Sequence, residues 1–247
     1  MPDEAVAQAA PSASAGVAQC GGPALPVITF YLDFISPYAY LAFEQLPRAL
    51  QGLSYRVQYL PILFAALLKH HGQLGPAEIA PKRAWTYRQV LWHAHALGIA
   101  LELPARHPFN PLPLLRLALG CSAPAWPGSI SRYVAETIFR HIWVGGAEAD
   151  DPARLQQLAV TLAPQREPGG AAVKAQLKHN TDQAIAHELF GVPAFAVDGR
   201  VFWGLDALPM LRDHLQRGTW ACGPDWDIAS QVGAGVVRKN PRSHQPP

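Results

Sequence analysis

The chain has 247 residues, of which 49% are hydrophobic and 15% are charged, enough apolar sequence for one large domain or for a domain with an insertion. Its formal net charge is only +2, and no basic cluster precedes Arg238-Lys239 near the C-terminus, so we expect no nucleic-acid partner. No apolar run approaches the ~20 residues that cross a bilayer, so we expect no membrane partner either.

The N-terminal segment and the cysteines favour a cytoplasmic protein. Residues 1–26 are rich in Ala, Gly, Pro and Ser and lack the basic start and continuous apolar stretch of a secretory signal, so we expect a disordered extension without a targeting role. Cys20, Cys121 and Cys222 are far apart and form no Cys-x-x-Cys motif. This spacing indicates three free thiols in a reducing compartment.

The first ordered segment predicts a strand that ends at a serine. Val27–Phe34 is apolar, β-branched and aromatic, as a centrally buried strand should be. Ser36 then takes a helix N-cap position and Pro37 the first helical position, and Pro47 is expected to end or kink this helix. Ser54–Leu60 alternates polar and apolar residues, which predicts a second strand and completes a βαβ unit.

Helical patterns fill most of the chain that follows, and a hairpin comes after them. Five helices are predicted in this part, over Lys82–Leu97, Asn110–Leu119, Ser131–Trp143, Pro152–Ala163 and Val173–Phe190. Gly191 follows the last of them as a C-cap signal. Ala194–Val197 and Val201–Trp203 are short strands joined by Asp198-Gly199, the strongest short hairpin signal. Leu208–Gln216 predicts a closing helix.

The order of these elements predicts an α/β fold with the thioredoxin topology. A β-α-β unit and a β-β-α unit flank an all-helical segment, so residues 27–62 and 187–217 are expected to form a thioredoxin-like domain. Residues 63–186 are then an inserted helical domain. From Arg217 the chain becomes polar and Gly-rich, and residues 218–247 are expected to be a poorly ordered tail.

Ser36 is a candidate for chemistry because of its place after the first strand. Backbone N–H groups in the first turn of a helix have no intrahelical partner and the helix dipole is positive there, so an anion is favoured. Ser36-Pro37-Tyr38-Ala39 contains no cysteine, which excludes disulfide exchange at this corner. The hydroxyl could donate a hydrogen bond to a thiolate that another molecule supplies, or it could simply cap the helix.

A second candidate is Gly191-Val192-Pro193-Ala194-Phe195. A proline that opens a strand facing such a corner is where thioredoxin-like folds have a cis peptide bond. The backbone of Val192 could then pair with a peptide-like ligand as a short added strand. The alternative is an ordinary edge strand that begins with Pro193.

The histidines and tryptophans of the helical segment are assigned to structure. His93 and His95 are two positions apart and point about 200° apart on a helix, so they cannot share one ion, and no metal site is predicted. Trp85, Tyr87, Trp92 and Trp143 are expected to pack in the core or between the domains, although one of them could line an aromatic pocket.

Three segments occur in an order that is typical of one family: FYLDFISPYAYLAFEQLP, HPFNPLPLLR and GVPAFAVDGRVFWGLDALPML. With them the chain resembles the 2-hydroxychromene-2-carboxylate isomerases, a family of the DsbA-like thioredoxin group that is related to the kappa-class glutathione transferases. The resemblance runs from about residue 27 to residue 216 and leaves both tails uncovered. It implies a glutathione-dependent enzyme that acts on a small aromatic keto acid, and a homodimer.

The resemblance also implies residues for glutathione. Ser36 matches the catalytic serine of the family, which contacts the glutathione sulfur. Val192, beside Pro193, matches the residue whose backbone binds the cysteine of glutathione. Trp203-Gly204-Leu205-Asp206 matches a WGxD stretch, in which Asp206 would meet the γ-glutamyl ammonium group and backbone groups would meet its carboxylate.

For the substrate, the resemblance implies two further residues. Lys69 matches a lysine near the substrate carboxylate, and Asn110 matches the asparagine of a PFN motif. The chain departs from the family pattern at three places: Ala207 stands where arginine is common, Gly72-Gln73 where Gly-Asn is usual, and Ile35 where a different residue often precedes the serine. The role of the Gly-Asn pair is therefore not carried over.

The implied reaction is a cis–trans isomerisation in which the glutathione thiolate adds to a conjugated double bond and leaves again. Two alternatives stay open. A kappa-like transferase would use the same corner to conjugate electrophiles, and a binding module without redox cysteines would hold extended peptides at the Val192 edge.

Overall fold

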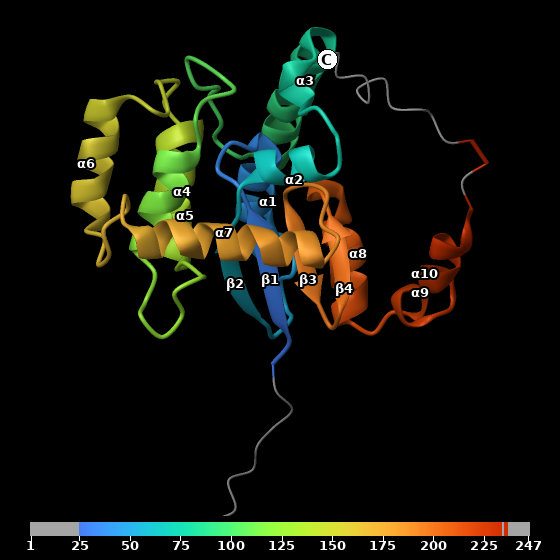
Figure 1. Cartoon of the computed structure of the whole chain (residues 1–247). Helices are drawn as coiled ribbons and strands as arrows, with labels where there is room; N and C mark the ends of the chain where they lie inside the picture. The colour runs from blue at the N-terminus through green and yellow to red at the C-terminus, as the bar shows by residue number, and fades with distance from the viewer. Residues whose placement is uncertain (1–24, 234, 237–247) are drawn as a thin grey trace, which may run out of the picture.

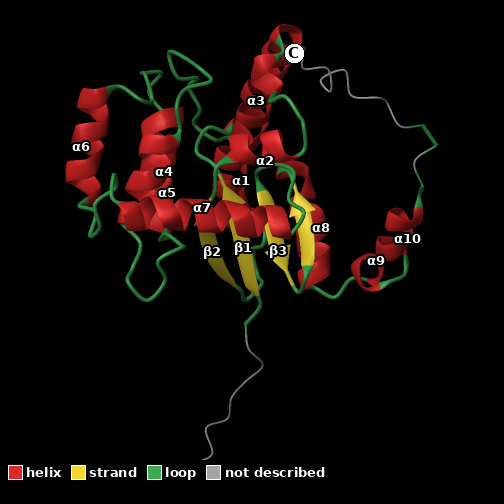
Figure 2. Ribbon diagram, viewed as in Figure 1, coloured by secondary structure: helices red, strands yellow, loops and turns green. Residues whose placement is uncertain are grey.

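A mixed four-stranded sheet lies at the centre of the molecule (Figures 1 and 2). The structure is a computed structural model that describes residues 25–233, 235 and 236. The strands are β1 (Val27–Leu32), β2 (Arg56–Pro61), β3 (Ala194–Val197) and β4 (Arg200–Trp203), in the spatial order β2-β1-β3-β4. β1 and β2 are parallel, whereas the β1–β3 and β3–β4 pairs are antiparallel. The predicted α/β fold of the thioredoxin type is confirmed.

Ten helices and three 3-10 turns surround the sheet in the described part of the chain. They are α1 (Pro37–Ala49), α2 (Phe64–His70), η1 (Pro76–Glu78), α3 (Ala80–Leu97), α4 (Leu112–Gly120), α5 (Arg132–Trp143), α6 (Pro152–Leu162), α7 (Ala171–Ala186), η2 (Leu205–Ala207), α8 (Leu208–Leu215), α9 (Thr219–Cys222), α10 (Asp225–Ile228) and η3 (Ala229–Gln231). None of these helices is long and apolar enough to span a membrane.

Alternating side chains of β1 build a core on each face of the sheet. Phe30 and Leu32 are fully buried in the larger core, which includes residues of α1, α5 and α8. Tyr31 points the other way, into a smaller core that includes residues of α2 and α7, and α7 crosses this face in Figure 1. Because both faces of β1 are covered, the strand must be apolar along its whole length, which explains the continuous run in the sequence.

Of the helical segment between β2 and β3, α4, α5 and α6 lie beside the sheet, α2 and α3 lie above it, and α7 crosses one face (Figure 1). Trp143 of α5 is fully buried, as predicted. The same prediction is wrong for Trp85 and Trp92, which are each 62% exposed on α3. Only Val90 and Ala94 of α3 are buried, because the apolar residues of this helix do not share one face and the helix projects from the body of the molecule.

Two helix ends differ from the prediction. Pro47 lies inside α1, which continues to Ala49, and Arg212 donates hydrogen bonds to the carbonyl groups of Ala49 (2.8 Å) and Gln51 (2.9 Å) beyond it. α7 ends at Ala186, not at Phe190. Glu188 has a left-handed backbone (φ +57°) that ends the helix without a glycine.

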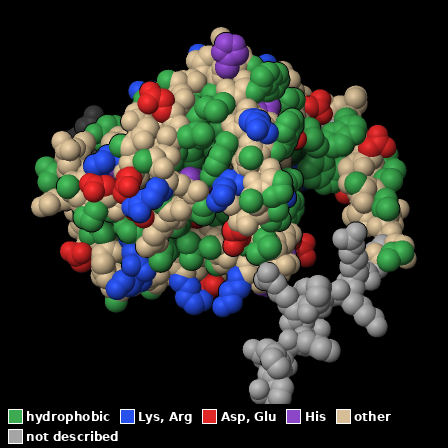
Figure 3. Space-filling view, turned by 90° about the horizontal axis from the view of Figure 1, so that it is seen from above, with side chains coloured by type: hydrophobic (Ala, Val, Ile, Leu, Met, Phe, Trp, Pro, Cys, Tyr) green, Lys and Arg blue, Asp and Glu red, His purple; other side chains and the backbone are tan. Residues whose placement is uncertain are grey.

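Residues beyond Arg217 include structure as well. α9 and α10 follow α8, and the ring of Trp226 lies 5.2 Å from that of Phe202 in β4. The guanidinium group of Arg200 lies over the same indole, 4.9 Å from its centre. Acidic and basic side chains are interspersed on the face seen from above (Figure 3), in line with the small net charge.

Candidate active site

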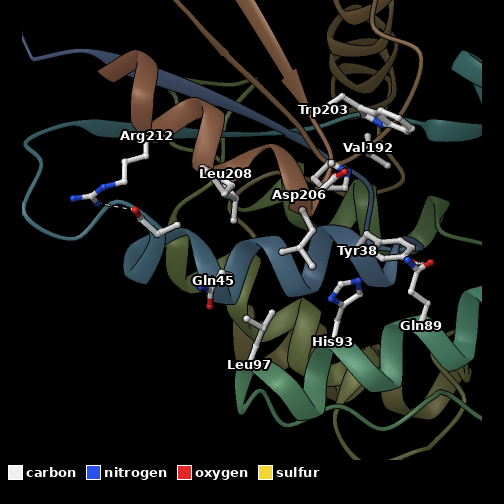
Figure 4. Close-up of a pocket in the computed structure, with 15 residues that line it drawn as sticks. Tyr38, Gln45, Gln89, His93, Leu97, Val192, Trp203, Asp206, Leu208 and Arg212 are labelled. Atoms are coloured by element: carbon white, nitrogen blue, oxygen red, sulfur yellow. Dashed lines mark hydrogen bonds between the residues drawn. The ribbon is translucent and has the colours of Figure 1, made fainter. Parts of the chain in front are cut away.

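A groove of about 740 Å³ runs along α1 on the side of the molecule where α3 and α8 approach it (Figure 4). Its walls come from α1, α3, the start of β3, the end of β4 and the start of α8. The lining residues are Tyr38, Gln45, Ala49, Gln89, His93, Leu97, Val192, Pro193, Trp203, Gly204, Leu205, Asp206, Leu208, Pro209 and Arg212. Most of them are apolar, and Asp206 is the only acidic residue among them.

Ser36 lies at one end of this groove and caps α1. Its backbone is extended (φ −89°, ψ 115°), and its Oγ accepts a hydrogen bond from the N–H of Ala39 at 3.2 Å. The same hydroxyl donates to the carbonyl oxygen of Val192 at 3.5 Å. Ser36 is only 8% exposed and does not itself line the groove, but the structure brings it next to Val192, which does.

The peptide bond between Val192 and Pro193 is cis, as expected from the sequence. The carbonyl oxygen of Pro193 accepts a hydrogen bond from the N–H of Gly204 at 2.9 Å, which fixes the predicted WGxD stretch against the start of β3. Within the described residues, the N–H groups of Val192, Leu205 and Asp206 have no acceptor. These free donors lie where a peptide-like ligand with a carboxylate could bind.

Two glycines make this geometry possible. Gly204 has a φ of +102°, and a Cβ atom there would lie 2.3 Å from Oδ1 of Asp206. A Cβ atom on Gly191 would lie 2.5 Å from Nε1 of Trp203. The indole of Trp203 is 52% exposed and packs on Phe190 with ring centres 4.9 Å apart. It therefore forms an aromatic wall at the mouth of the groove.

The opposite wall contains residues that the sequence analysis missed as site residues. The hydroxyl of Tyr38 donates to Oε1 of Gln89 at 2.8 Å, and the ring of His93 lies 6.3 Å from that of Tyr38 (Figure 4). Burial raises the pKa of Tyr38, and the negative charge of Asp206 across the groove raises it further. Tyr38 belongs to the four-residue motif after the first strand, but no sequence signal places α3 against it.

A buried carboxyl group lies behind the site. Asp33 is fully buried, and its oxygens accept hydrogen bonds from the N–H groups of Ile35 (3.1 Å) and Phe64 (2.9 Å). Burial raises the pKa of Asp33 to about 7, although the backbone N–H bonds oppose this shift. Asp33 therefore ties the end of β1 to the start of α2.

The two residues predicted for the substrate do not line the groove. Lys69 is exposed in the last turn of α2. Asn110 is exposed before α4, and its Oδ1 accepts a hydrogen bond from the N–H of Leu112 at 3.1 Å. The amide oxygen of Asn110 thus has a local role, and contact of either residue with substrate stays a prediction. No group of three or more metal-ligating side chains occurs in the described part of the chain.

The fold and the start of α1 define a thioredoxin-fold protein in which Ser36-Pro37-Tyr38-Ala39 stands in place of a redox Cys-x-x-Cys motif. The family model of the DSBA-like thioredoxin domain matches residues 27–216, and the chain belongs to this family.

Within the family, the chain is similar to isomerases and to glutathione transferases. It is 26% identical to the 2-hydroxychromene-2-carboxylate isomerase of Pseudomonas putida over 83% of this chain and all of that protein. It is 25% identical to glutathione S-transferase kappa 2 of Caenorhabditis elegans, over 78% of this chain and 93% of the relative. A solved structure of a 2-hydroxychromene-2-carboxylate isomerase has the same fold, with a TM-score of 0.66 over 82% of this chain and 98% of that one at 23% identity.

Proposed function

We propose that the protein is a glutathione-dependent cis–trans isomerase of 2-hydroxychromene-2-carboxylate-type acids in aromatic catabolism. The observation that carries the proposal is the Ser36 hydroxyl at the mouth of α1, in hydrogen-bond contact with the carbonyl group of Val192. The similarity to isomerases of that name supports the choice of reaction. A homodimer in the cytoplasm is part of the same proposal, on the basis of the family resemblance.

The residues present fit glutathione. The free N–H of Val192 could pair with its cysteine backbone, and the free N–H groups of Leu205 and Asp206 could bind its γ-glutamyl carboxylate. The carboxylate of Asp206 would meet the ammonium group next to that carboxylate. Pro193, Trp203 and Gly204 shape this end of the groove.

When bound, glutathione supplies a thiolate that adds reversibly to the conjugated double bond of the acid, so that the bond can rotate and nothing is oxidised. The chain favours the anionic sulfur with the dipole of α1 and with the Ser36 hydroxyl, which would turn its proton from the carbonyl oxygen of Val192 to the sulfur. Lys69 and Asn110 are proposed to stabilise the substrate carboxylate and the developing enolate. The absence of cysteine from Ser36-Pro37-Tyr38-Ala39 fits a reaction without electron transfer.

A kappa-like transferase is the second candidate, because the chain is about as similar to a kappa-class relative as to an isomerase. It would share the glutathione site and differ in the fate of the adduct, which is released. The two functions are distinguished by incubating the protein and glutathione with 2-hydroxychromene-2-carboxylate and, separately, with 1-chloro-2,4-dinitrobenzene. Isomer formation with full recovery of glutathione supports the isomerase, whereas conjugate formation alone supports the transferase.

The substitution Ser36→Ala tests the assigned role directly. Removing one donor to a developing charge lowers kcat by about 10-fold or more, because such a donor contributes more than ~1.4 kcal/mol. The measurement is kcat with saturating glutathione, and unchanged turnover in this variant contradicts the proposal. If glutathione leaves the Tm of the wild-type chain unchanged while extended peptides raise it, the chain is a peptide-binding module instead.

A further inference from the structure

The short loop that carries Ser36 is held by two side chains from the segment between β2 and β3. Nε1 of Trp143 donates to the carbonyl oxygen of Phe34 at 3.1 Å. Nε2 of His107 lies 2.8 Å from the carbonyl oxygen of Ile35. The two rings contact each other, with centres 5.5 Å apart. Neither carbonyl group belongs to the sheet or to α1, so these side chains supply the partners that secondary structure does not.

The peptide group between Ile35 and Ser36 is held at both ends. Its carbonyl oxygen faces His107, and its N–H donates to the carbonyl oxygen of Asp33 at 3.1 Å. A change in ψ of Ile35 that is not cancelled by an opposite change in φ of Ser36 turns this peptide plane and moves the Ser36 hydroxyl. Rotation therefore requires the loss of both hydrogen bonds.

His107 is set up to act as a neutral donor. Its Nε2 lies 2.8 Å from the carbonyl oxygen of Ile35, which can only accept, so Nε2 carries the ring proton. Nδ1 is then an acceptor, 2.7 Å from the hydroxyl of Tyr87, which also lies 3.2 Å from the carbonyl oxygen of His107. Burial lowers the pKa of His107, which favours this uncharged form. The ring also contacts Phe109, with centres 5.7 Å apart.

We infer that His107 is a positioning residue for Ser36, and that Tyr87, as the donor to Nδ1, supports the His107 tautomer that does this. The inference rests on the proposed function in one respect only, the effect of His107 on bound glutathione. There, a correctly placed Ser36 hydroxyl stabilises the thiolate. Neither residue lines the groove, so they act through the loop and not through contact with a ligand.

The first test uses the full chain without ligand. His107→Phe keeps a ring but removes the donor, whereas His107→Gln can place an N–H close to the position of Nε2. Hydrogen exchange of the Ser36 amide is expected to be roughly 3- to 10-fold faster in the Phe variant and near wild type in the Gln variant, given the net worth of one hydrogen bond. Amides in the middle of α5 serve as the reference for global stability. Equal Ser36 exchange in the Phe variant and the wild type overturns the inference.

The second test measures the thiol pKa of bound glutathione from thiolate absorbance near ~240 nm. We expect the pKa to rise by about 0.5 to 1 unit in His107→Phe, equivalent to roughly 3- to 10-fold less thiolate, and to return toward wild type in His107→Gln. A residue that only supports the fold would not move this value. An unshifted pKa in the Phe variant, with the wild-type pKa depressed, overturns the positioning inference and leaves the proposed function intact.

Other outcomes are also decisive. If wild-type protein does not bind glutathione, the proposed function fails, and the exchange test still decides whether His107 positions the loop. If His107→Phe does not fold, Tyr87→Phe takes its place, because it removes only the hydroxyl that supports His107 at Nδ1. In the Tyr87→Phe variant, a smaller acceleration of Ser36 amide exchange, about 2- to 3-fold, supports the inference. Ser36 exchange at the wild-type rate overturns it.

Discussion

Gly204 shows how far a single residue constrains the site. Its backbone is in the left-handed region, and a side chain would meet the carboxylate of Asp206. Gly204→Ala is therefore expected to destabilise the fold by about 1–2 kcal/mol and to weaken glutathione binding at least about 10-fold. Gly199→Ala is the matched control, because Gly199 also has a positive φ (+75°) but has open space around it. Thermal unfolding and calorimetric titration of both variants separate backbone strain from the loss of the site. Equal loss of affinity in both contradicts the role of the contact with Asp206.

At the same scale, the sequence reveals residues that lie in short local patterns. Ser36 follows a strand and precedes a proline, and Val192 precedes another, so both can be recognised without knowledge of packing. Asp33, Tyr38 and His107 cannot be recognised in this way. Asp33 is one polar residue in an apolar run, and its importance comes from burial and from a bond to Phe64, far along the chain. His107 reaches Ile35 across 72 positions.

At the scale of elements, α3 is a wall of the groove with few attachments to the body. Val90 and Ala94 are its only buried residues, and polar links to α1 come from Tyr38 to Gln89 (2.8 Å) and from Arg48 to the Leu97 carbonyl (3.0 Å). Local opening of such a helix requires much less free energy than global unfolding. The wall that faces Trp203 is thus expected to be the more mobile one.

Gln89→Leu tests this arrangement. It removes the acceptor for Tyr38, so hydrogen exchange of the α3 amides is expected to become roughly 2- to 10-fold faster, while exchange in α5 does not change. Arg88→Leu is the neighbouring control, because Arg88 is exposed and does not line the groove. Faster exchange in the Arg88 variant to the same degree would show that the hydrogen bond to Tyr38 is not what holds α3.

Elements were predicted from the sequence better than their ends. Order, type and the hairpin turn at Asp198-Gly199 follow from periodicity and turn residues, and the structure confirms them. The end of α7 was missed because Glu188, not a glycine, takes the left-handed position. Pro47 was expected to end or kink α1; the helix does not end there but continues for two residues, and Arg212 donates to the carbonyl groups of Ala49 and Gln51. The end of α7 is thus a local backbone feature, whereas the carbonyl groups after Pro47 are satisfied by a side chain distant in sequence.

For the whole molecule, Asp33 links stability to pH. Its pKa is 3.8 in an ordinary environment and about 7 in the folded chain, so the folded state binds the extra proton between these values. The stabilisation is fully present below pH 3.8 and is lost as the pH rises through about 7. The free energy of unfolding is therefore expected to carry a falling contribution of a few kcal/mol across this window.

Asp33→Asn isolates this contribution from the histidines. Burial lowers the pKa values of His107 and His141, which has the opposite sign: stability is lost as the pH falls below 6.5. The difference in unfolding free energy between wild type and Asp33→Asn, from urea titrations at pH 5 and pH 8, cancels the histidine term. We expect the advantage of the wild type to be larger at pH 5. A difference that does not change with pH contradicts a raised pKa of Asp33.

The weak burial of α3 has a consequence for how such a molecule can diversify. Sixteen of its eighteen positions lie outside the core, so most substitutions there leave folding nearly unaffected. Yet Gln89, His93 and Leu97 line the groove together with Val192, whose carbonyl oxygen accepts from Ser36. Changes in this one helix can therefore alter the lining of the groove without disturbing the end next to Ser36 and Val192, a route by which new preferences evolve without a loss of foldability.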